Sequence, residues 1–180
     1  NSRAVHCNRK GELYFGSTNG YFFFDPSNIR SNSTIPKIVF TDLKVNNIPI
    51  DINTPGSPLR KDISVTTQLE LTRKQNVFTI GFAALNFIEP ENNRYAFKLE
   101  GFDKQWNEVG HQQSATYTNL DPGDYTFRVR ASNNDGLWNE EGVSLEIIIL
   151  PAWWETWYAK IGYLALFILG IFFFRKHTII

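Results

Sequence analysis

Few side chains in this sequence have the chemistry needed for catalysis. The 180 residues contain three histidines and a single cysteine, Cys7, and no Gly-x-Ser-x-Gly motif of a serine hydrolase. His6 and Cys7 are neighbours, so in an extended strand their side chains point to opposite faces and do not form a dyad. One cysteine also excludes an internal disulfide and a Cys-x-x-Cys metal site. We therefore predict no catalytic residue, no metal site and no cofactor in this chain.

The acidic residues are the next candidates, as a glycosidase pair. They lie mostly in predicted turns: Asp103, Glu108, Asp121, Asp124, Asp135, Glu140 and Glu141. A glycosidase holds two carboxyl groups at a defined separation in a cleft, which solvated turns do not provide. Trp106 and Trp138 offer rings for sugar stacking, but tryptophan in a β-sandwich is more often part of a core or an interface. We predict that this segment is not an enzyme.

The charge balance bears on the partners of the chain. Eighteen Lys and Arg residues balance eighteen Asp and Glu residues. The chain therefore has no net positive electrostatic field that would attract nucleic acid, and we expect no nucleic-acid partner.

The body of the chain is predicted to be a series of β-strands. From residue 37 to 150, apolar and polar residues alternate with period two, and Pro, Gly, Asn and Asp interrupt the alternation. The predicted strands are residues 37–45, 67–72, 76–85, 94–101, 114–120, 124–132 and 143–150. This spacing is typical of an antiparallel β-sandwich of the immunoglobulin or fibronectin type.

Two turns sharpen the prediction. Pro122 and Gly123 precede Tyr125, whose hydroxyl is expected to bond to the backbone a few residues upstream, as in the tyrosine corner of Greek-key sandwiches. SNNDG, residues 132–136, predicts a hairpin turn. It is not a calcium loop, because Ala131 and Gly142 occupy the positions of the first Asp and the bidentate Glu.

The C-terminal part is predicted to be a single transmembrane helix. Residues 161–174, IGYLALFILGIFFF, carry no charge. This run is shorter than the roughly 20 residues that cross a bilayer core, but Trp157, Tyr158 and Ala159 extend it, and Lys160 can reach the interface with its ammonium group.

The residues around this run predict its orientation. Trp153, Trp154, Trp157 and Tyr158 form an aromatic belt before it, and Arg175 and Lys176 follow it. Aromatic residues mark the membrane interface and basic residues the cytoplasmic side. The alternative is a buried core helix of a soluble domain.

The N-terminal part differs from the body. Residues 11–26, GELYFGSTNGYFFFDP, predict two short strands joined by a Ser-Thr-Asn-Gly turn. A hairpin alone would bury almost nothing on either face, so we interpret it as part of a propeller blade whose other blades lie upstream. The alternative is an extra hairpin packed on the sandwich. We expect the chain to be a segment of a longer protein.

Several stretches resemble a known family. Residues 11–26 resemble the final repeat of the two-component regulator propeller. NRYAFKLEGFDKQW (93–106) and SATYTNLDPGDYTFRVRASNNDGLWNE (114–140) resemble the Y_Y_Y domain, which follows such propellers in hybrid two-component sensors of Bacteroidetes. PAWWETWY (151–158) before a single span is similar to the junction usual in that family.

The resemblance assigns a structural role to several residues. The tyrosines of the family correspond to Tyr95, Tyr117 and Tyr125. Phe97 stands where a further tyrosine is often found, and it lacks the hydroxyl. The other motif positions are Gly101, Trp106, Pro122, Gly123, Asn133 and Gly136.

The resemblance also implies an organisation. The expected parts are a terminal propeller-blade fragment (1–26), a linker (27–36), a Y_Y_Y immunoglobulin-like β-sandwich (37–150), an interfacial aromatic segment (151–158), a transmembrane helix core (159–174) and a cytoplasmic juxtamembrane stub (175–180). The implied location is the bacterial inner membrane, with residues 1–150 in the periplasm. The implied partners are upstream propeller blades, the lipid bilayer, a second copy in a homodimer, and an oligosaccharide bound mainly outside this segment. A histidine kinase is expected beyond residue 180.

The shortness of the junction suggests a mechanism. The last predicted strand ends at Leu150, and only Pro151 and Ala152 separate it from Trp153. Without a Gly/Ser linker there is no compliant joint, so we expect a rigid coupler that passes a dimer rearrangement to the transmembrane helix. Gly162 and Gly170 form no Gly-x-x-x-Gly pair, so dimerisation would come mostly from outside the membrane. The rival hypothesis is a membrane-anchored carbohydrate-binding or adhesion module.

Overall fold

The computed structural model describes the backbone of residues 5–28 and 31–178, with side chains as far as Arg175. The chain divides into two compact units, Asn1–Ser33 and Thr34–Ile180. The division falls within the predicted linker, and each unit is described by itself.

The first unit is a three-stranded antiparallel sheet. It consists of β1 (Val5–Cys7), β2 (Leu13–Ser17) and β3 (Gly20–Phe24) in the order β1-β2-β3, followed by the short helix η1 (Pro26–Asn28). The two predicted strands are thus present, and a third pairs with the first of them.

Aromatic rings cover both faces of this sheet. Tyr14 stacks on Phe23 with ring centroids 5.3 Å apart. On the other face, Phe15 stacks between Phe22 and Phe24, at 5.4 and 5.8 Å. Much of this apolar surface is exposed, including 58% of Phe22 and 57% of Phe23.

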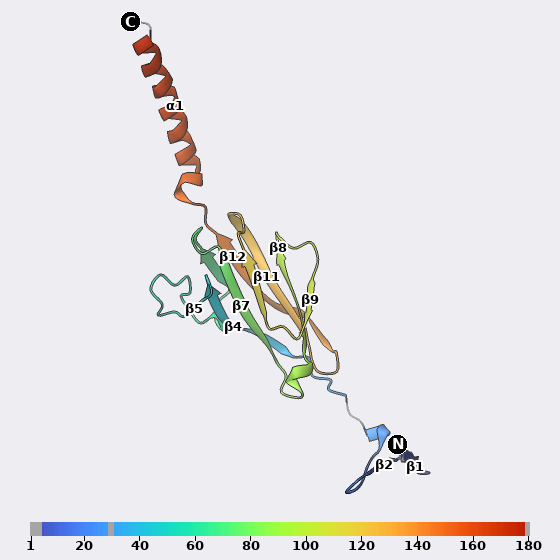
Figure 1. Ribbon diagram of the computed structural model, residues 1–180. Helices are drawn as coiled ribbons and strands as arrows, with labels where there is room; N and C mark the ends of the chain where they lie inside the picture. Colours follow the sequence, from blue (N-terminus) through green and yellow to red (C-terminus); the bar gives the residue numbers. More distant parts are fainter. Residues whose placement is uncertain (1–4, 29–30, 179–180) are drawn as a thin grey trace. The chain divides into compact units, whose positions relative to one another are not determined.

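The second unit is a β-sandwich followed by a helix (Figure 1). One sheet has the order β10-β7-β4-β5 and the other has the order β6-β12-β11-β8-β9. The first sheet comprises β4 (Lys37–Val45), β5 (Ile48–Ile50), β7 (Val77–Leu85) and β10 (Ser114–Thr118). The second comprises β6 (Gln68–Leu71), β8 (Arg94–Glu100), β9 (Asn107–Gly110), β11 (Gly123–Ser132) and β12 (Trp138–Ile149). The short helices are η2 (Ile63–Val65), η3 (Pro90–Asn92) and η4 (Trp153–Glu155), and the long helix is α1 (Trp157–Thr178).

The predicted sandwich is confirmed, with local differences. Each predicted strand has a counterpart, and β4 has the predicted bounds. One pair is not antiparallel, because edge strand β6 runs parallel to β12. Strands β5 and β9 were not predicted. β9 is short and mostly exposed, so it has no apolar alternation to reveal it.

The core lies between the two sheets. Phe127, Val129 and Ala131 of β11 are fully buried, whereas Arg128 and Arg130 between them are only partly buried. This confirms the predicted alternation along the strand. Phe127 lies at the centre of an aromatic cluster whose other members are Phe40, Phe82, Phe97 and Tyr117, with ring centroids 5.9–6.3 Å from its own.

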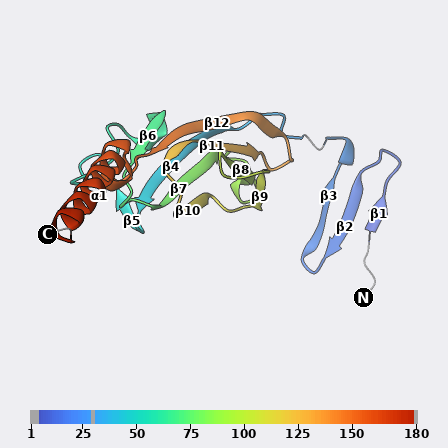
Figure 2. The ribbon, with the colours of Figure 1, turned by 90° about the horizontal axis from the view of Figure 1, so that it is seen from above.

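The two ends of the sandwich differ in the segments that lie there. At one end, which we call the linker end, the chain enters at Pro36 beside the β11–β12 turn. At the other, the helix end, the turns 72–76 and 119–122 lie beside the end of β12. Strand β12 extends along the whole sandwich and joins the two ends (Figure 2).

Candidate functional site at the helix end of the sandwich

The ladder of β12 continues to the last residue before the proline. The backbone N–H of Leu150 donates to the carbonyl of Leu71 at 2.8 Å. Pro151 has no N–H and ends the pairing. Ala152 follows and is buried, at 7% exposure. Helix α1 begins at Trp157, so a short segment, residues 150–156, separates the sheet from the helix.

This short segment is folded tightly around Glu155. The Glu155 carboxylate accepts a hydrogen bond from the Ala152 N–H at 3.2 Å, and the Glu155 N–H donates to the Ala152 carbonyl at 2.9 Å. The Thr156 hydroxyl donates to the carbonyl of Trp153 at 2.6 Å. The segment is therefore a closed turn with its own hydrogen bonds, not an open linker.

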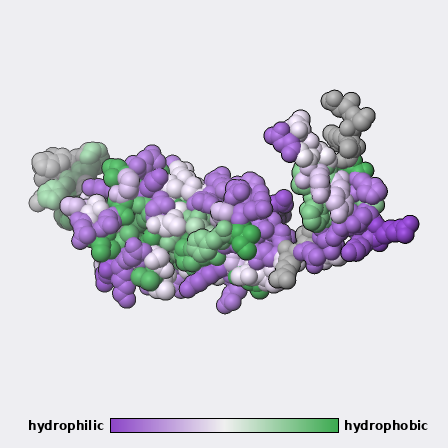
Figure 3. Space-filling model, turned by 90° about the horizontal axis from the view of Figure 1, so that it is seen from below, coloured by the Kyte–Doolittle hydropathy of each residue, from purple (hydrophilic) through white to green (hydrophobic). Residues whose placement is uncertain are grey.

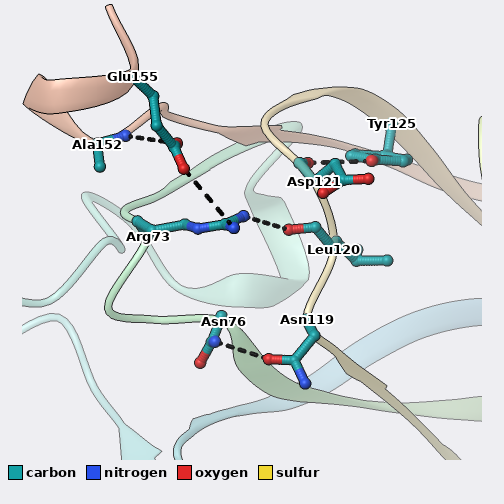
Figure 4. A network of polar contacts seen from close by, with 8 residues as sticks. All are labelled: Arg73, Asn76, Asn119, Leu120, Asp121, Tyr125, Ala152 and Glu155. Carbon is teal, nitrogen blue, oxygen red and sulfur yellow. Dashed lines mark hydrogen bonds and ion pairs between the residues drawn. The ribbon is translucent and has the colours of Figure 1, made fainter.

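Arg73 connects this turn to the sandwich. Its guanidinium lies 3.8 Å from a Glu155 carboxylate oxygen and donates to the carbonyl of Leu120 at 3.2 Å. Figure 4 shows Arg73 between the two. Three segments that are distant in sequence meet here, and we call this set of contacts, made by Arg73, Glu155 and the Leu120 carbonyl, the junction clamp.

The turn that carries Leu120 is itself fixed on both sides. The Tyr125 hydroxyl donates to the carbonyl of Asp121 at 3.0 Å, which is the bond of the predicted tyrosine corner. On the other side, the Asn76 amide donates to the Asn119 side-chain oxygen at 2.9 Å (Figure 4). Asn119 has a left-handed backbone with φ of 54°, a conformation that asparagine tolerates better than most residues.

Replacing Arg73 with alanine is expected to loosen the junction without unfolding the sandwich. Its ion pair is more than one-third exposed, and such pairs contribute about 1 kcal/mol or less. The lost hydrogen bond adds about 1 kcal/mol. We expect faster amide hydrogen exchange in residues 119–122 and 152–156 only. Lys74→Ala, in the same turn and exposed, is the matched control, and equal exchange in the two variants would show that the clamp does not hold the turn.

The other predicted tyrosines are buried between the sheets. Tyr95 is 1% exposed, and its hydroxyl accepts hydrogen bonds from the Ala84 N–H and the Gln113 amide, each at 3.2 Å. Tyr117 is 6% exposed, and its hydroxyl donates to the Asp103 carboxylate at 2.7 Å. Each hydroxyl therefore has a partner, as buried polar groups require.

Tyr117 is expected to make stability depend on pH in the alkaline range. Burial, followed by the hydrogen bond to Asp103 and its negative charge, raises the pKa of the Tyr117 hydroxyl. An unfolded tyrosine ionises near pH 10, whereas the folded chain keeps the Tyr117 proton to higher pH. Raising the pH above about 10 therefore stabilises the unfolded chain relative to the folded one. The contribution of Tyr117 is complete below about pH 10 and is lost above it.

Tyr117→Phe tests this dependence. We expect a loss of about 1.5–3 kcal/mol at pH 7, because a hydrogen bond to a charged group disappears. The difference between Tyr117→Phe and the native chain should shrink between about pH 10 and 11 in urea unfolding. A difference that stays constant from pH 8 to 11 would contradict the raised pKa.

The remaining family positions are distributed over several parts of the sandwich. Phe97 is partly buried and packs against the core residues Phe82, Tyr117 and Phe127, so its ring keeps a packing role without the hydroxyl. Gly101 has a φ of 94°, and an added Cβ would lie 3.0 Å from the Tyr125 ring. A side chain at this position would therefore press on the tyrosine corner.

Trp106 lies on the outer face of the second sheet. The Arg130 guanidinium lies 4.7 Å from the Trp106 ring and 5.1 Å from the Trp138 ring. Arg130 also pairs with Glu140 at 2.8 Å and with Glu108 at 3.7 Å. These tryptophans form a cation–π cluster that links β9, β11 and β12.

Asn133 and Gly136 lie in the turn at the linker end. Asn133 is fully buried, and its side-chain oxygen accepts from the N–H groups of Asp135 and Leu137 at 3.0 and 2.9 Å. Gly136 has a φ of 81°, which favours glycine. Pro122 and Gly123, by contrast, lie at the helix end, where β11 starts.

Helix α1 is long and apolar enough to cross a membrane. Its candidate span is Trp157–Arg175, and none of that window is buried within the chain. The visible part of the helix is green in Figure 3. The buried-helix alternative is therefore not what the structure shows.

The predicted interface residues flank or begin this span. Trp153, Trp154, Trp157 and Tyr158 are all exposed, between 48% and 73%. Arg175 is exposed near the end of α1, and Lys176 belongs to the helix, but its side chain lies outside the described residues. The last residues of the predicted stub, 179–180, also lie outside them.

Sequence reasoning missed the residues of the junction clamp. In the structure, the Glu155 carboxylate accepts a hydrogen bond from Ala152 and pairs with Arg73. Asp103, Arg130 and Asn139 were also missed as partners. Nothing in the local pattern around Arg73 distinguishes it from an ordinary turn residue, because its partners lie in distant parts of the chain.

Comparison with known proteins agrees with this fold. Residues 86–150 match the Y_Y_Y domain. The chain is 37% identical over 147 residues to Histidine kinase P4 of Formosa agariphila, covering 82% of this chain and 11% of that protein.

Solved structures show the same similarity. The extracellular domain of BT3049, a B. thetaiotaomicron protein named as a hybrid two component system, has a TM-score of 0.64 and 30% identity, over 82% of this chain and 20% of that one. The extracellular domain of BT4673 from the same organism, named as a one component system, has a TM-score of 0.62 and 27% identity, over 83% and 20%.

The chain thus spans about a tenth of the curated relative and a fifth of the solved domains. It resembles the extracellular domains of proteins that are named as one component and hybrid two component systems. Residues 86–150 match the Y_Y_Y domain, in a chain that is homologous to Histidine kinase P4 over 147 residues and has the fold of the extracellular domains of two-component systems.

Proposed function

We propose that this chain is the membrane-proximal coupling module of a two-component sensor. Helix α1 crosses the inner membrane once, residues 1–150 lie in the periplasm, and the C-terminus is cytoplasmic. The observation that carries the proposal is the junction clamp, in which Arg73 holds both the turn before α1 and the Leu120 carbonyl. A displacement of the sandwich is transmitted through these contacts to the base of the helix.

The linker end is held in a comparable way. The Asn133 amide donates to the Thr34 carbonyl at 3.0 Å, and the Asn139 amide donates to the Pro36 carbonyl at 2.8 Å. Asn139 belongs to β12, which runs on to Ile149 beside the junction. Strand β12 therefore connects the contacts at the linker end to those at the helix end. This continuous strand supports the proposal that the module is stiff along its length.

A conformational signal requires two states that the ligand binds with different affinity. In this proposal, two copies of the receptor change their arrangement when an oligosaccharide binds upstream, and the module transmits the change. A difference of a few kcal/mol between the two states is sufficient. Gly162 and Gly170 supply no tight helix–helix contact, so the dimer is held mainly outside the membrane.

The exposed aromatic residues of the first unit are evidence for propeller blades upstream of this chain. Both of its faces carry exposed rings, among them Tyr21 at 70% and Phe22 at 58%. Apolar surface of this kind on both sides of a sheet is typical of an element that packs between neighbours. We therefore infer that residues 1–26 complete a propeller whose other strands precede this chain.

The rival hypothesis, a carbohydrate-binding or adhesion module, has less support. Trp106 and Trp138 were its best stacking rings, and both contact Arg130 instead. The coupler is tested by interrupting the junction with a flexible insertion after Leu150, which leaves any binding surface of the sandwich unchanged.

A further inference from the structure

A cleft of about 490 Å³ lies along the free side of β6. Loop residues 56–67 and strand β6 form its walls, and Gln75 and Leu150 lie among its lining residues. Its volume is within the range of small-ligand sites.

Two neighbouring cations of the cleft are held on a fixed backbone. Arg60 and Lys61 are exposed, but Leu59 before them and Ile63 after them are buried in the core, at 6% and 3% exposure. Asp62 caps η2, because its carboxylate accepts from the Ser64 N–H at 2.9 Å. The cationic side chains are thus presented from an anchored loop.

The chemistry of the lining favours an anionic group. Among the residues that the structure describes, neither Arg60 nor Lys61 forms an ion pair, whereas the nearby Arg73 does. Glu70 is the one carboxylate among the lining residues that the structure describes, and hydroxyl and amide side chains make up most of the others. Guanidinium, ammonium, hydroxyl and amide groups are the donors that bind phosphate oxygens. None of the described lining residues is aromatic, so the cleft offers no stacking surface for a sugar.

The position of the cleft indicates where that phosphate would come from. Leu150 lines the cleft, and Trp153 is three residues further along the chain. Three extended residues span about 10 Å at most. Interfacial tryptophans lie at the level of the lipid headgroups, so the cleft opens close to that layer. This step rests on the proposed membrane anchoring by α1.

We propose that this cleft binds the phosphate headgroup of an anionic phospholipid of the surrounding bilayer, with Arg60 and Lys61 as its main ligands. Gln75 connects the cleft to the junction. Its amide donates to the Gly56 carbonyl at 3.5 Å, and it shares a turn with Arg73. A bound headgroup therefore contacts the same turn that holds the base of the helix.

Hydrogen exchange of the full chain in lipid nanodiscs tests this proposal. One set of nanodiscs contains phosphatidylcholine alone, and the other contains phosphatidylcholine with phosphatidylglycerol. We expect slower exchange of residues 56–75 only with phosphatidylglycerol, and loss of this slowing in the Arg60→Gln/Lys61→Gln double variant. Two basic residues at an anionic surface correspond to roughly a thirty-fold change in binding.

The control removes the same charge from the opposite end of the sandwich. Lys37→Gln/Arg94→Gln replaces two exposed cations near the linker end and should keep the effect of phosphatidylglycerol. A double variant Arg60→Gln/Lys61→Gln that still shows the effect would overturn the proposal, as would a native chain that shows none. Slowing by inorganic phosphate in neutral nanodiscs would assign the site to free phosphate and overturn the lipid assignment.

The same measurement separates this proposal from the anchoring on which it rests. Exchange protection of residues 157–175 in both kinds of nanodisc reports that α1 is inserted. Protected helix amides without a lipid effect at residues 56–75 would overturn the headgroup site alone. Unprotected helix amides would overturn the anchoring and the site together.

Discussion

A Gly-Ser stretch inserted after Leu150 is expected to abolish the response of the full receptor to its ligand. The insertion separates the last ladder bond, from the Leu150 N–H to the Leu71 carbonyl, from the turn that contains Glu155. A flexible linker behaves as a random coil, so it absorbs a displacement that the short native segment transmits. The sandwich keeps its core, because the insertion follows the final strand.

The expected size of this effect follows from the coupling energy. Coupling between two sites is typically about 1–3 kcal/mol, or roughly 5–150-fold, and an uncoupled helix loses all of it. Signal output is measured in cells with and without ligand, together with the amount of receptor in the membrane. The same stretch inserted between Ile52 and Asn53, in an exposed loop, is the control and should preserve the response. An unchanged response after the insertion at Leu150 would refute the coupler.

Phe127→Ala is expected to cause the largest loss of stability. The ring is fully buried and contacts aromatic residues of both sheets, including Phe40 of β4 and Phe97 of β8. Phe→Ala in a packed core costs about 3–5 kcal/mol, because apolar contacts are lost and a cavity remains. A whole domain is stable by only about 5–15 kcal/mol, so this change removes a large part of the total.

Phe102→Ala is the matched control for this measurement. Phe102 also contacts Tyr117 through its ring, with centroids 5.9 Å apart, but 58% of it is exposed. Its replacement should cost about 1 kcal/mol or less. Urea unfolding of the full chain in detergent, followed by tryptophan fluorescence, gives both values. Equal losses in the two variants would contradict the central position of Phe127.

The long strands were predictable from local patterns. In β4, burial alternates on either side of a register shift between Phe40 and Leu43, and in β11 it alternates from Phe127 to Ala131. A period of two is visible in the sequence itself. The tyrosine corner was also predictable, because Tyr125 and Asp121 are only four residues apart. The parallel pairing of β6 with β12 was not, because the choice of a partner strand depends on the order of the sheet and not on the strand's own residues.

The sequence alone determined the sandwich class, the candidate membrane span and the shortness of the segment between them. Each of these depends on residues close together in the chain, through alternation, hydrophobic length and composition. Only the tertiary structure decided what that segment contacts. Arg73 donates a hydrogen bond to the carbonyl of Leu120, 47 residues away, and pairs with Glu155. The Arg130 guanidinium lies over the rings of Trp106 and Trp138. These contacts exist because the order of strands in the two sheets brings residues that are distant in sequence together, and no local pattern specifies that order.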